Sequence, residues 1–170
     1  SMSASAIHEP QIITEAVAAD MANPLFEDAQ YRILIVRLSP FRDVESSYTH
    51  LVLFDETRRA LPAAYIDFAF MPNLPHKKAL SMENRPWFFG RASNRSALEF
   101  NMLLISCAFS LELLNIPWLL TQSGIPFSRQ ERMENDSLPF LLLGGSRAVC
   151  SGSLVKIADN SVIDSLVDAM

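Results

Sequence analysis

The stretch Met102-Leu-Leu-Ile-Ser-Cys-Ala108 decides the fold, because this apolar run shows no alternation of polar and apolar side chains. Such a run is typical of a strand that is covered on both faces. We expect a helix after it, with Ser110 as the N-cap and Gly124 as the residue that closes its C-terminal end. A second buried strand, Pro139-Phe-Leu-Leu-Leu143, then runs into Gly144-Gly145-Ser146. Together these elements are predicted to form a β-α-β unit.

The region before this unit adds two strands and a helix. Arg32–Leu38 is short, apolar and β-branched, and Tyr65–Phe70 alternates as an outer strand does. Between them, Val44–Leu61 has apolar residues at helical spacing and charged residues on another face. Strands that alternate with helices through short connections imply a parallel sheet. The sequence therefore predicts an α/β fold, three-layered and Rossmann- or flavodoxin-like, with a parallel sheet of about four to five strands.

Two segments are less regular. Residues 1–30 hold a weak helical pattern at Gln11–Met21, and we interpret them as a remnant of tag removal (Ser1-Met2) followed by a helix or linker. Met71–Phe100 contains several prolines and is predicted to be a loop-rich insert. Within it we expect a short strand at Trp87–Phe89 and room for a helix whose bounds the pattern does not give.

The C-terminal region is expected to lead into a further strand. We interpret Ser161–Val167 as a short helix or turn, and the pattern stops within the next element, at Met170. We therefore expect residues 31–170 to be one domain that is excised from a longer protein and truncated at its C-terminal end. A sheet edge left bare in this way can pair between two copies, so a dimer is one expectation.

Composition and charge narrow the functional classes. The 170 residues are 49% hydrophobic, which is enough for one compact domain. The net charge is −5 and Lys or Arg residues cluster only as pairs, which argues against nucleic-acid binding. The two cysteines are typical of reduced thiols and no signal peptide is visible, so we expect a cytoplasmic protein. Glu112, Asn115 and Pro117 interrupt the apolar run that ends at Leu120, which favours a strand plus a helix over a membrane span.

The carboxyl ends of the predicted strands are the expected ligand site, because ligands bind there in open parallel α/β sheets. Paired glycines let the backbone approach a bulky ligand, and small hydroxyl groups supply hydrogen bonds. The alternative is that Gly144-Gly145 only forms a sharp turn after its strand. The residues predicted to contact a ligand are Ser39, Pro40, Phe41, Arg42, Ser106, Ala108, Ser110, Gly144, Gly145 and Ser146.

Several chemistries lack their sequence signatures. The chain has no Gly-x-Gly-x-x-Gly, no Gly-x4-Gly-Lys-Ser/Thr and no Gly-x-Ser-x-Gly. Its three histidines have no metal-ligand spacing, and His50 falls in the middle of a predicted helix, where a surface or internally satisfied role is expected. Cys107 is interpreted as a small hydrophobe within its strand. Glu112 is the one unusual carboxylate: it either stabilises its helix through the dipole, which we favour, or bonds a ligand.

Four segments, in this order along the chain, resemble the N-terminal region of cobalamin-dependent (class B) radical SAM proteins. They are Arg32–Val44, Leu103–Pro117, Ser123–Pro126 and Leu141–Ser146, and the resemblance covers about Tyr31 to Met170. It implies a flavodoxin-like, cobalamin (B12)-binding domain that precedes a radical SAM barrel. It also implies that the 4Fe-4S iron–sulfur cluster and S-adenosylmethionine bind in that barrel, outside this chain, because the Cys-x3-Cys-x2-Cys motif is missing here.

The same resemblance assigns roles to three of the candidate residues. Ser106 and Gly144-Gly145 match the serine and the paired glycines that line the channel for the nucleotide tail of cobalamin. The chain departs from the pattern where methionine-synthase-type domains carry Asp-x-His-x-x-Gly, since Ser39–Val44 has neither the histidine nor the glycine. The usual Ser-x-Leu is replaced by Ser106-Cys107-Ala108. A bound cobalamin is therefore expected to lack a histidine lower ligand from this loop.

Two functions follow as expectations. In the first, the domain holds cobalamin against the downstream radical SAM domain of the same protein, and the parent enzyme uses it for methyl transfer or another radical step. The chain alone is then non-catalytic. In the second, the chain is a degenerate Rossmann-like docking domain of a radical SAM protein and no longer binds cobalamin. A hydrolase that uses Ser110 or Cys107 is disfavoured, because no histidine partner can be placed near either residue.

Overall fold

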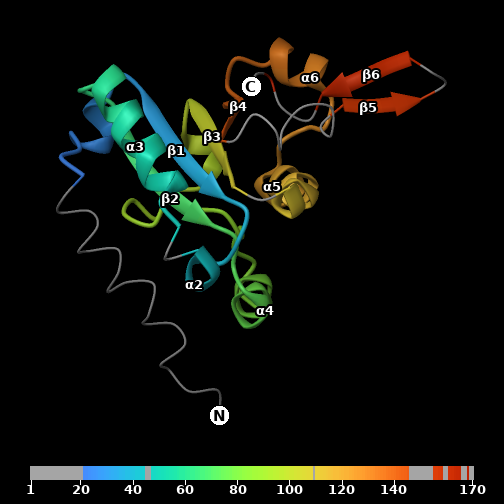
Figure 1. Ribbon diagram of the computed structural model, residues 1–170, viewed down its shortest axis with the longest axis horizontal. Helices are drawn as coiled ribbons and strands as arrows, with labels where there is room; N and C mark the ends of the chain where they lie inside the picture. The colour runs from blue at the N-terminus through green and yellow to red at the C-terminus, as the bar shows by residue number, and fades with distance from the viewer. Residues whose placement is uncertain are drawn as a thin grey trace.

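The computed structural model describes residues 21–44, 47–108, 110–145, 155–158, 161–165 and 168. Its centre is a four-stranded parallel sheet with the strand order β2-β1-β3-β4 (Figure 1). The strands are β1 (Arg32–Arg37), β2 (Tyr65–Phe70), β3 (Met102–Cys107) and β4 (Phe140–Gly145). The predicted α/β fold with a parallel sheet is confirmed, and β2 is an outer strand of this sheet as expected.

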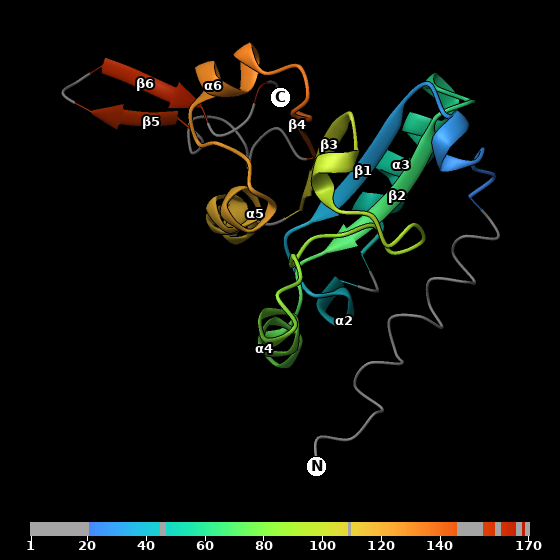
Figure 2. The same ribbon diagram turned by 180° about the vertical axis from the view of Figure 1, so that it is seen from behind.

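Helical elements connect the strands and cover both faces of the sheet. They are η1 (Phe26–Asp28), α2 (Phe41–Val44), α3 (Thr49–Ala60), α4 (Leu74–Met82), η2 (Ala97–Glu99), η3 (Ser110–Asn115), α5 (Ile116–Ser123) and α6 (Arg129–Glu134). Alternate strand residues enter two separate apolar clusters. Ile35 lies in the cluster against which Leu53 of α3 packs, whereas Val36 lies in the cluster that contains Leu119 of α5. The sheet therefore separates α3 from α5, which gives three layers (Figures 1 and 2).

The helix predicted over Val44–Leu61 is shorter than expected. The structure has the single turn α2, which ends at Val44, and a separate helix α3 that begins at Thr49. Ser47 lies between them, and its hydroxyl accepts a hydrogen bond from the side chain of Arg37. Serine side chains compete with the backbone for hydrogen bonds and disfavour helix interiors, which explains why the helix does not continue through this position.

The segment Met71–Phe100 contains the helix α4, whose bounds the sequence did not give. Asn73 is the N-cap of α4, because its side chain accepts a hydrogen bond from the backbone N–H of His76. The expected strand at Trp87–Phe89 is wrong: Phe89 forms only an isolated bridge with Ser96. The apolar run Trp87–Phe89 does not form a strand, because a carboxylate on β2 holds the loop that follows it in a turn.

That carboxylate belongs to Asp67, which is fully buried in β2. It accepts hydrogen bonds from the backbone N–H groups of Ala92 at 3.0 Å, Ser93 at 2.8 Å and Phe68 at 2.7 Å. Burial raises the pKa of Asp67, and the hydrogen bonds partly offset this rise. A Cβ atom at position 90 would collide with the carboxylate, so Gly90 is required for the loop to approach β2 this closely.

The C-terminal elements differ from the prediction. Ser161–Ser165 is a strand, β6, rather than a helix or turn, and it pairs antiparallel with β5 (Val155–Ala158). The two strands are separated by two residues in the sequence, and Val162 and Ile163 have the β-branched side chains that favour strands. Asp168 then returns to the main sheet, where its backbone N–H donates to Leu141 O at 2.8 Å.

The N-terminal segment also packs on the sheet. Met21 and Ala29 are buried, and the ring of Phe26 contacts Tyr65 and Phe100 edge-on with centroid distances of 5.0 and 5.5 Å. Most of the helix expected at Gln11–Met21 lies outside the described residues. In the part of the chain that the structure describes, no helix is both long enough and apolar enough to cross a membrane.

Candidate functional site

Four residues form one row across the carboxyl edge of the sheet. Phe70 of β2 pairs in register with Arg37 of β1, Arg37 pairs with Ser106 of β3, and Ser106 pairs with Gly144 of β4. β1 has β2 on one side and β3 on the other, so the strand order reverses beside β1. This switch point is where ligands bind in open α/β sheets. Arg37 lies on the α3 face of the sheet, as does Ile35 two residues before it.

A buried ion pair fills the switch point. Arg37 is fully buried, and its Nε and Nη2 donate to the two carboxylate oxygens of Glu112 at 2.8 and 3.2 Å. Its Nη1 donates to Ser47 Oγ at 2.9 Å and to His50 Nδ1 at 3.3 Å. Glu112 is only 3% exposed and also accepts from the backbone N–H of Ala108 at 3.2 Å. These bonds join the end of β1 to the start of α3 and to the turn after β3.

His50 belongs to this cluster as a neutral side chain. Desolvation, with a second contribution from the positive charge of Arg37, lowers the pKa of His50 from 6.5 to about 4. A guanidinium group can only donate, so Nδ1 of His50 accepts from Arg37 and the ring proton lies on Nε2. The imidazole ring also contacts Phe68 and Phe70 edge-on, at centroid distances of 5.7 and 5.3 Å. His50 thus lies between the guanidinium of Arg37 and two phenylalanine rings and is buried from solvent.

The surroundings of Ser106 favour a bound cobalamin tail, whereas those of Gly144 do not. Ser106 Oγ is buried and has no hydrogen-bond partner among the residues that the structure describes, which favours a ligand or water at this point. Gly144 is different, because a Cβ atom there would come within 3.1 and 3.3 Å of the methyl groups of Leu53. The space beside Gly144 is therefore occupied by α3. The ion pair of Arg37 lies in the same row.

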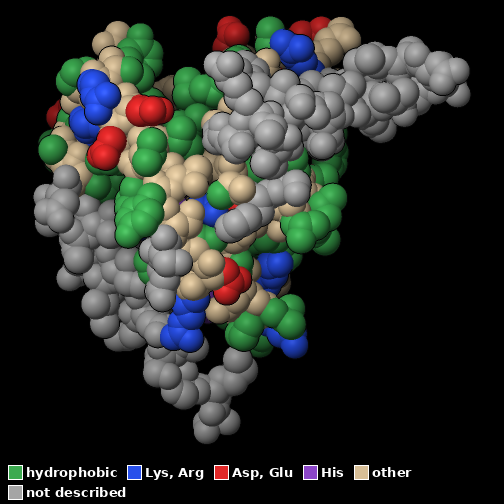
Figure 3. Space-filling view, viewed as in Figure 1, with side chains coloured by type: hydrophobic (Ala, Val, Ile, Leu, Met, Phe, Trp, Pro, Cys, Tyr) green, Lys and Arg blue, Asp and Glu red, His purple; other side chains and the backbone are tan. Residues whose placement is uncertain are grey.

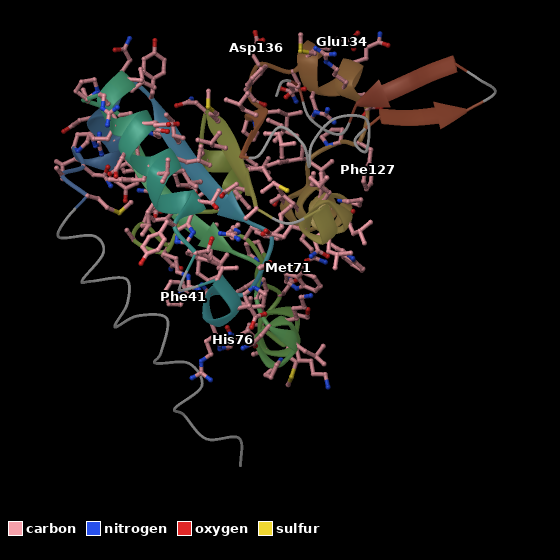
Figure 4. All side chains as sticks on the ribbon, viewed as in Figure 1. Phe41, Met71, His76, Phe127, Glu134 and Asp136 are labelled. Carbon is pink, nitrogen blue, oxygen red and sulfur yellow. The ribbon has the colours of Figure 1, made fainter. Side chains whose placement is uncertain are left out.

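Phe41, in the loop after β1, packs on β2 rather than toward Ser106. The ring of Phe41 packs edge-on against Phe70 at a centroid distance of 5.1 Å, and the guanidinium of Arg91 lies 5.5 Å from its centre. Figure 4 shows Phe41 on α2 at the end of the sheet, on the side of α4 and Met71. Ser39 and Pro40 are partly exposed and Arg42 is exposed. This loop thus covers the end of β2 rather than the row residues of β3 and β4.

The other candidates lie near the row or outside the description. Ala108 follows β3 directly and is partly exposed, and its N–H bonds to Glu112 as described above. Ser110 is the first residue of η3, and Gly145 is the last residue of β4, paired with Cys107. Ser146 lies outside the described residues. The structure therefore brings Ser106, Ala108 and the two glycines to one edge and directs Phe41 elsewhere.

Sequence reasoning missed the centre of the site, which is Arg37 with its partners. Arg37 was treated as part of an apolar strand, and Glu112 was expected to act mainly through the helix dipole. The available signal was that each is a lone charge in an apolar run, and buried charges require partners. His50 was expected to be a surface or internally satisfied residue, and at 4% exposure with a bond to Arg37 it is the second of these.

Comparison with known proteins identifies one family. A model of the family described as "Radical SAM proteins, N-terminal" matches residues 52–165, which is more than half of the chain. The matched range contains Ser106, Glu112 and Gly144, and it begins after Arg37 and His50. No curated protein and no solved structure matches. Within the residues described, no group of three or more His, Cys, Asp or Glu side chains is placed to hold a metal ion.

Proposed function

This chain belongs to the family of N-terminal regions of radical SAM proteins, and we propose that it serves its protein as a Rossmann-like docking domain that packs on the radical SAM domain. The observation that carries the proposal is the filled switch point. Arg37 and Glu112 occupy the place where this fold usually receives a ligand, and both are buried. Because internal contacts fill the ligand crevice, we assign the function of the domain to its outer surface.

The chemistry of the cluster supports a structural role for it. His50 is neutral with its Nδ1 engaged by Arg37, and Glu112 accepts from both Arg37 and the N–H of Ala108. A general base or a metal ligand needs a free lone pair that a substrate or an ion can reach. The contacts of Arg37 with Glu112, Ser47 and His50 lie inside the domain, so the cluster fixes the positions of β1, α3 and η3 relative to one another.

The docking proposal is tested on the full-length radical SAM protein by lysine-directed crosslinking and mass spectrometry. Lys77 and Lys78 of α4 offer reactive amines on the described part of the chain. We expect crosslinks within one polypeptide between this domain and the radical SAM domain, at dilutions where crosslinks between copies vanish. Absence of such crosslinks, together with scattering data showing two independently tumbling bodies, would contradict the proposal.

Cobalamin binding is the second candidate function, and Ser106 is the observation in its favour. A buried hydroxyl without a partner is costly unless something bonds to it, and Ser106 stands between Arg37 and Gly144 in the row. Binding of the nucleotide tail requires Leu53, and with it α3, to move away from Gly144. Once bound, cobalamin would supply an alkyl-carrying cobalt centre; Ser106 and the backbone at Gly144 are the groups of this chain that would contact its tail.

A hydroxocobalamin titration of the full-length protein separates the two candidates. The docking proposal predicts an unchanged corrin spectrum and no corrinoid that co-elutes with the protein on gel filtration. The cobalamin proposal predicts stoichiometric co-elution that is lost in the Ser106→Leu variant, because the larger side chain fills the space beside the hydroxyl. An Ala97→Ser variant, which alters a buried residue of the opposite cluster, serves as the control for indirect effects on the fold.

A further inference from the structure

The segment Leu111–Ser123 exposes several apolar side chains while it buries a charged one. Leu111, Leu114 and Trp118 are 74%, 71% and 49% exposed. We call these three residues the outer stripe; their spacing of three and four residues places them on one side of η3 and α5. The charged residue of the same segment turns the other way: Glu112 is 3% exposed and bonds to Arg37. A surface helix normally shows the reverse arrangement.

Specific contacts fix the orientation of this segment on the domain. Glu112 is held by Arg37 at the end of β1, and Asn115 Nδ2 donates to Leu38 O at 3.1 Å. On the same inward side, Ile116 and Leu119 are fully buried in the cluster beneath α5. Rotating the segment to hide the outer stripe would break these polar bonds in a buried site and would expose Ile116 and Leu119 in its place.

The outer stripe continues onto the segment that follows α4. Trp118 stacks on Trp87 with a centroid distance of 5.5 Å and an interplanar angle of 23°. The ring of Trp87 is held in turn by a hydrogen bond from its Nε1 to Ser81 Oγ at 3.3 Å, and Lys77 Nζ lies 4.9 Å from its centre. Figure 3 shows exposed apolar side chains on the side of the molecule where Figure 1 places α5. The outer stripe together with Trp87 thus forms an apolar surface with the positive charge of Lys77 at its rim.

We infer that the outer stripe is the surface through which this domain docks on the radical SAM domain of its own protein. The inference rests on the docking function proposed above and adds the surface and the chemistry of the partner. The partner face is apolar, with a carboxylate placed to meet Lys77. Apolar residues exposed together in this way mark interaction surfaces, and aromatic anchors such as Trp118 contribute most to such contacts.

The size of the patch favours a tethered partner over a second copy. The exposed surface of the three residues is on the order of 400 Å². A stable interface between free proteins buries about 800 Å² on each partner. A domain in the same polypeptide meets its partner at an effective concentration in the millimolar range, so a smaller contact is enough to hold it. The radical SAM domain is the occupant that satisfies this condition.

The test places a photo-crosslinker at the centre of the stripe in the full-length protein. Leu114 is replaced by p-benzoyl-phenylalanine, and in a matched control Leu25 is replaced in the same way. Leu25 is also a leucine and is 74% exposed, but it lies before η1. We expect position 114 to crosslink to the radical SAM domain of the same polypeptide, and position 25 to give no such product. The double substitution Leu111→Glu and Leu114→Glu is expected to abolish the lysine crosslinks that report docking.

Each other outcome overturns a defined statement. If lysine crosslinks between the domains persist while position 114 gives none, the domain docks through another face; this inference fails and the docking function stands. Crosslinks from position 114 to a second copy would make the stripe a dimer contact and overturn the assignment of its partner. If neither reagent joins the two domains, the docking function and the surface fail together. Circular dichroism of each variant confirms that the fold is retained.

Discussion

Two arginines stand at the two ends of the same strand, and the fold uses them in opposite ways. Arg32 begins β1, is partly exposed, and bonds to the carbonyl oxygens of Phe26 at 2.8 Å and Glu27 at 3.3 Å. Arg37 ends β1, is fully buried, and forms the ion pair with Glu112. The amino end of the strand thus uses its charge to fasten a surface turn, whereas the carboxyl end uses it to fill the crevice where ligands bind in related sheets.

The difference shows that position in the sheet, rather than residue type, decides the role of a charge. At the amino edge, water can replace a lost hydrogen bond, so the surface contact of Arg32 is replaceable. At the carboxyl edge, Glu112 depends on Arg37, because an unpaired carboxylate at 3% exposure has lost most of its hydration. Removing each arginine in turn tests this difference between the two edges of the sheet.

The largest effect is expected from Arg37→Ala. This change leaves the carboxylate of Glu112 buried without its main partner, so the free energy of unfolding should fall by about 3–5 kcal/mol. Arg32→Ala removes partly exposed bonds and should cost about 1 kcal/mol. Urea unfolding of both variants beside the parent chain measures the two values. Equal losses at the two ends of β1 would mean that the carboxyl edge is as open to water as the amino edge.

The next effect is the pH dependence that His50 introduces. Its pKa falls from 6.5 in the unfolded chain to about 4 in the folded protein, so between these values the unfolded state binds a proton that the folded state does not. The free energy of unfolding should therefore fall as the pH is lowered from about 6.5 to about 4, by roughly 2–3 kcal/mol from this residue. In His50→Asn this part of the slope should disappear, which urea unfolding at a series of pH values would reveal. An unchanged slope would place His50 in a solvated position.

A smaller effect is expected at the other end of the row. Gly144→Ala brings a Cβ atom to within 3.1 Å of Leu53 Cδ2, so the domain should lose about 1 kcal/mol of stability. In a Leu53→Val background the same change should cost nothing, because the crowding methyl group is withdrawn. Thermal unfolding of the four proteins measures this coupling. A Gly144→Ala variant as stable as the parent would show that α3 is free to move from β4, as cobalamin binding requires.

The smallest effect is expected on the outer stripe. Leu111→Glu is expected to change the free energy of unfolding of the 170-residue chain by no more than about 0.5 kcal/mol, because the side chain is 74% exposed and no partner of it is lost. Its neighbour Glu112, altered to Leu, should remove the carboxylate that pairs with buried Arg37 and destabilise the same chain by several times more. Substitutions at these two adjacent positions thus distinguish a residue of the docking surface from a residue that stabilises the fold. A large loss in Leu111→Glu would show that the stripe belongs to the core.

The four strands of the parallel sheet and the glycine that ends α5 could be predicted because their signals are local. Met102–Cys107 reads as a buried strand from its own residues, and Gly124 closes α5 with a positive φ of 70° as expected of a helix-terminating glycine. The Arg37–Glu112 pair could not be predicted in this way, because its members are 75 residues apart and meet only when β1 and β3 become neighbours. β6 was misread as a helix or turn because five residues carry too little periodicity to separate the two states.

The strand positions of two candidate residues could be predicted, but not their neighbours in space. Ser106 and Gly144 lie near the carboxyl ends of neighbouring strands, as the apolar runs before them indicated. The sequence pattern did not reveal which side chains lie beside these two residues. Leu53 lies against Gly144, and Arg37 lies in the same row as Ser106. Such contacts depend on where α3 lies across the sheet, which is a property of packing rather than of local pattern.

The most direct test of the account is a double-mutant cycle between Arg37 and Glu112, with Arg37→Met, Glu112→Leu and the two changes combined. A buried ion pair that fills the switch point predicts two single variants that each lose about 3–5 kcal/mol, and a double variant close to the parent, because apolar side chains then occupy the crevice without an unpaired charge. Additive losses, with a coupling energy near zero, would mean that the two side chains do not meet and that the strand ends remain open to a ligand.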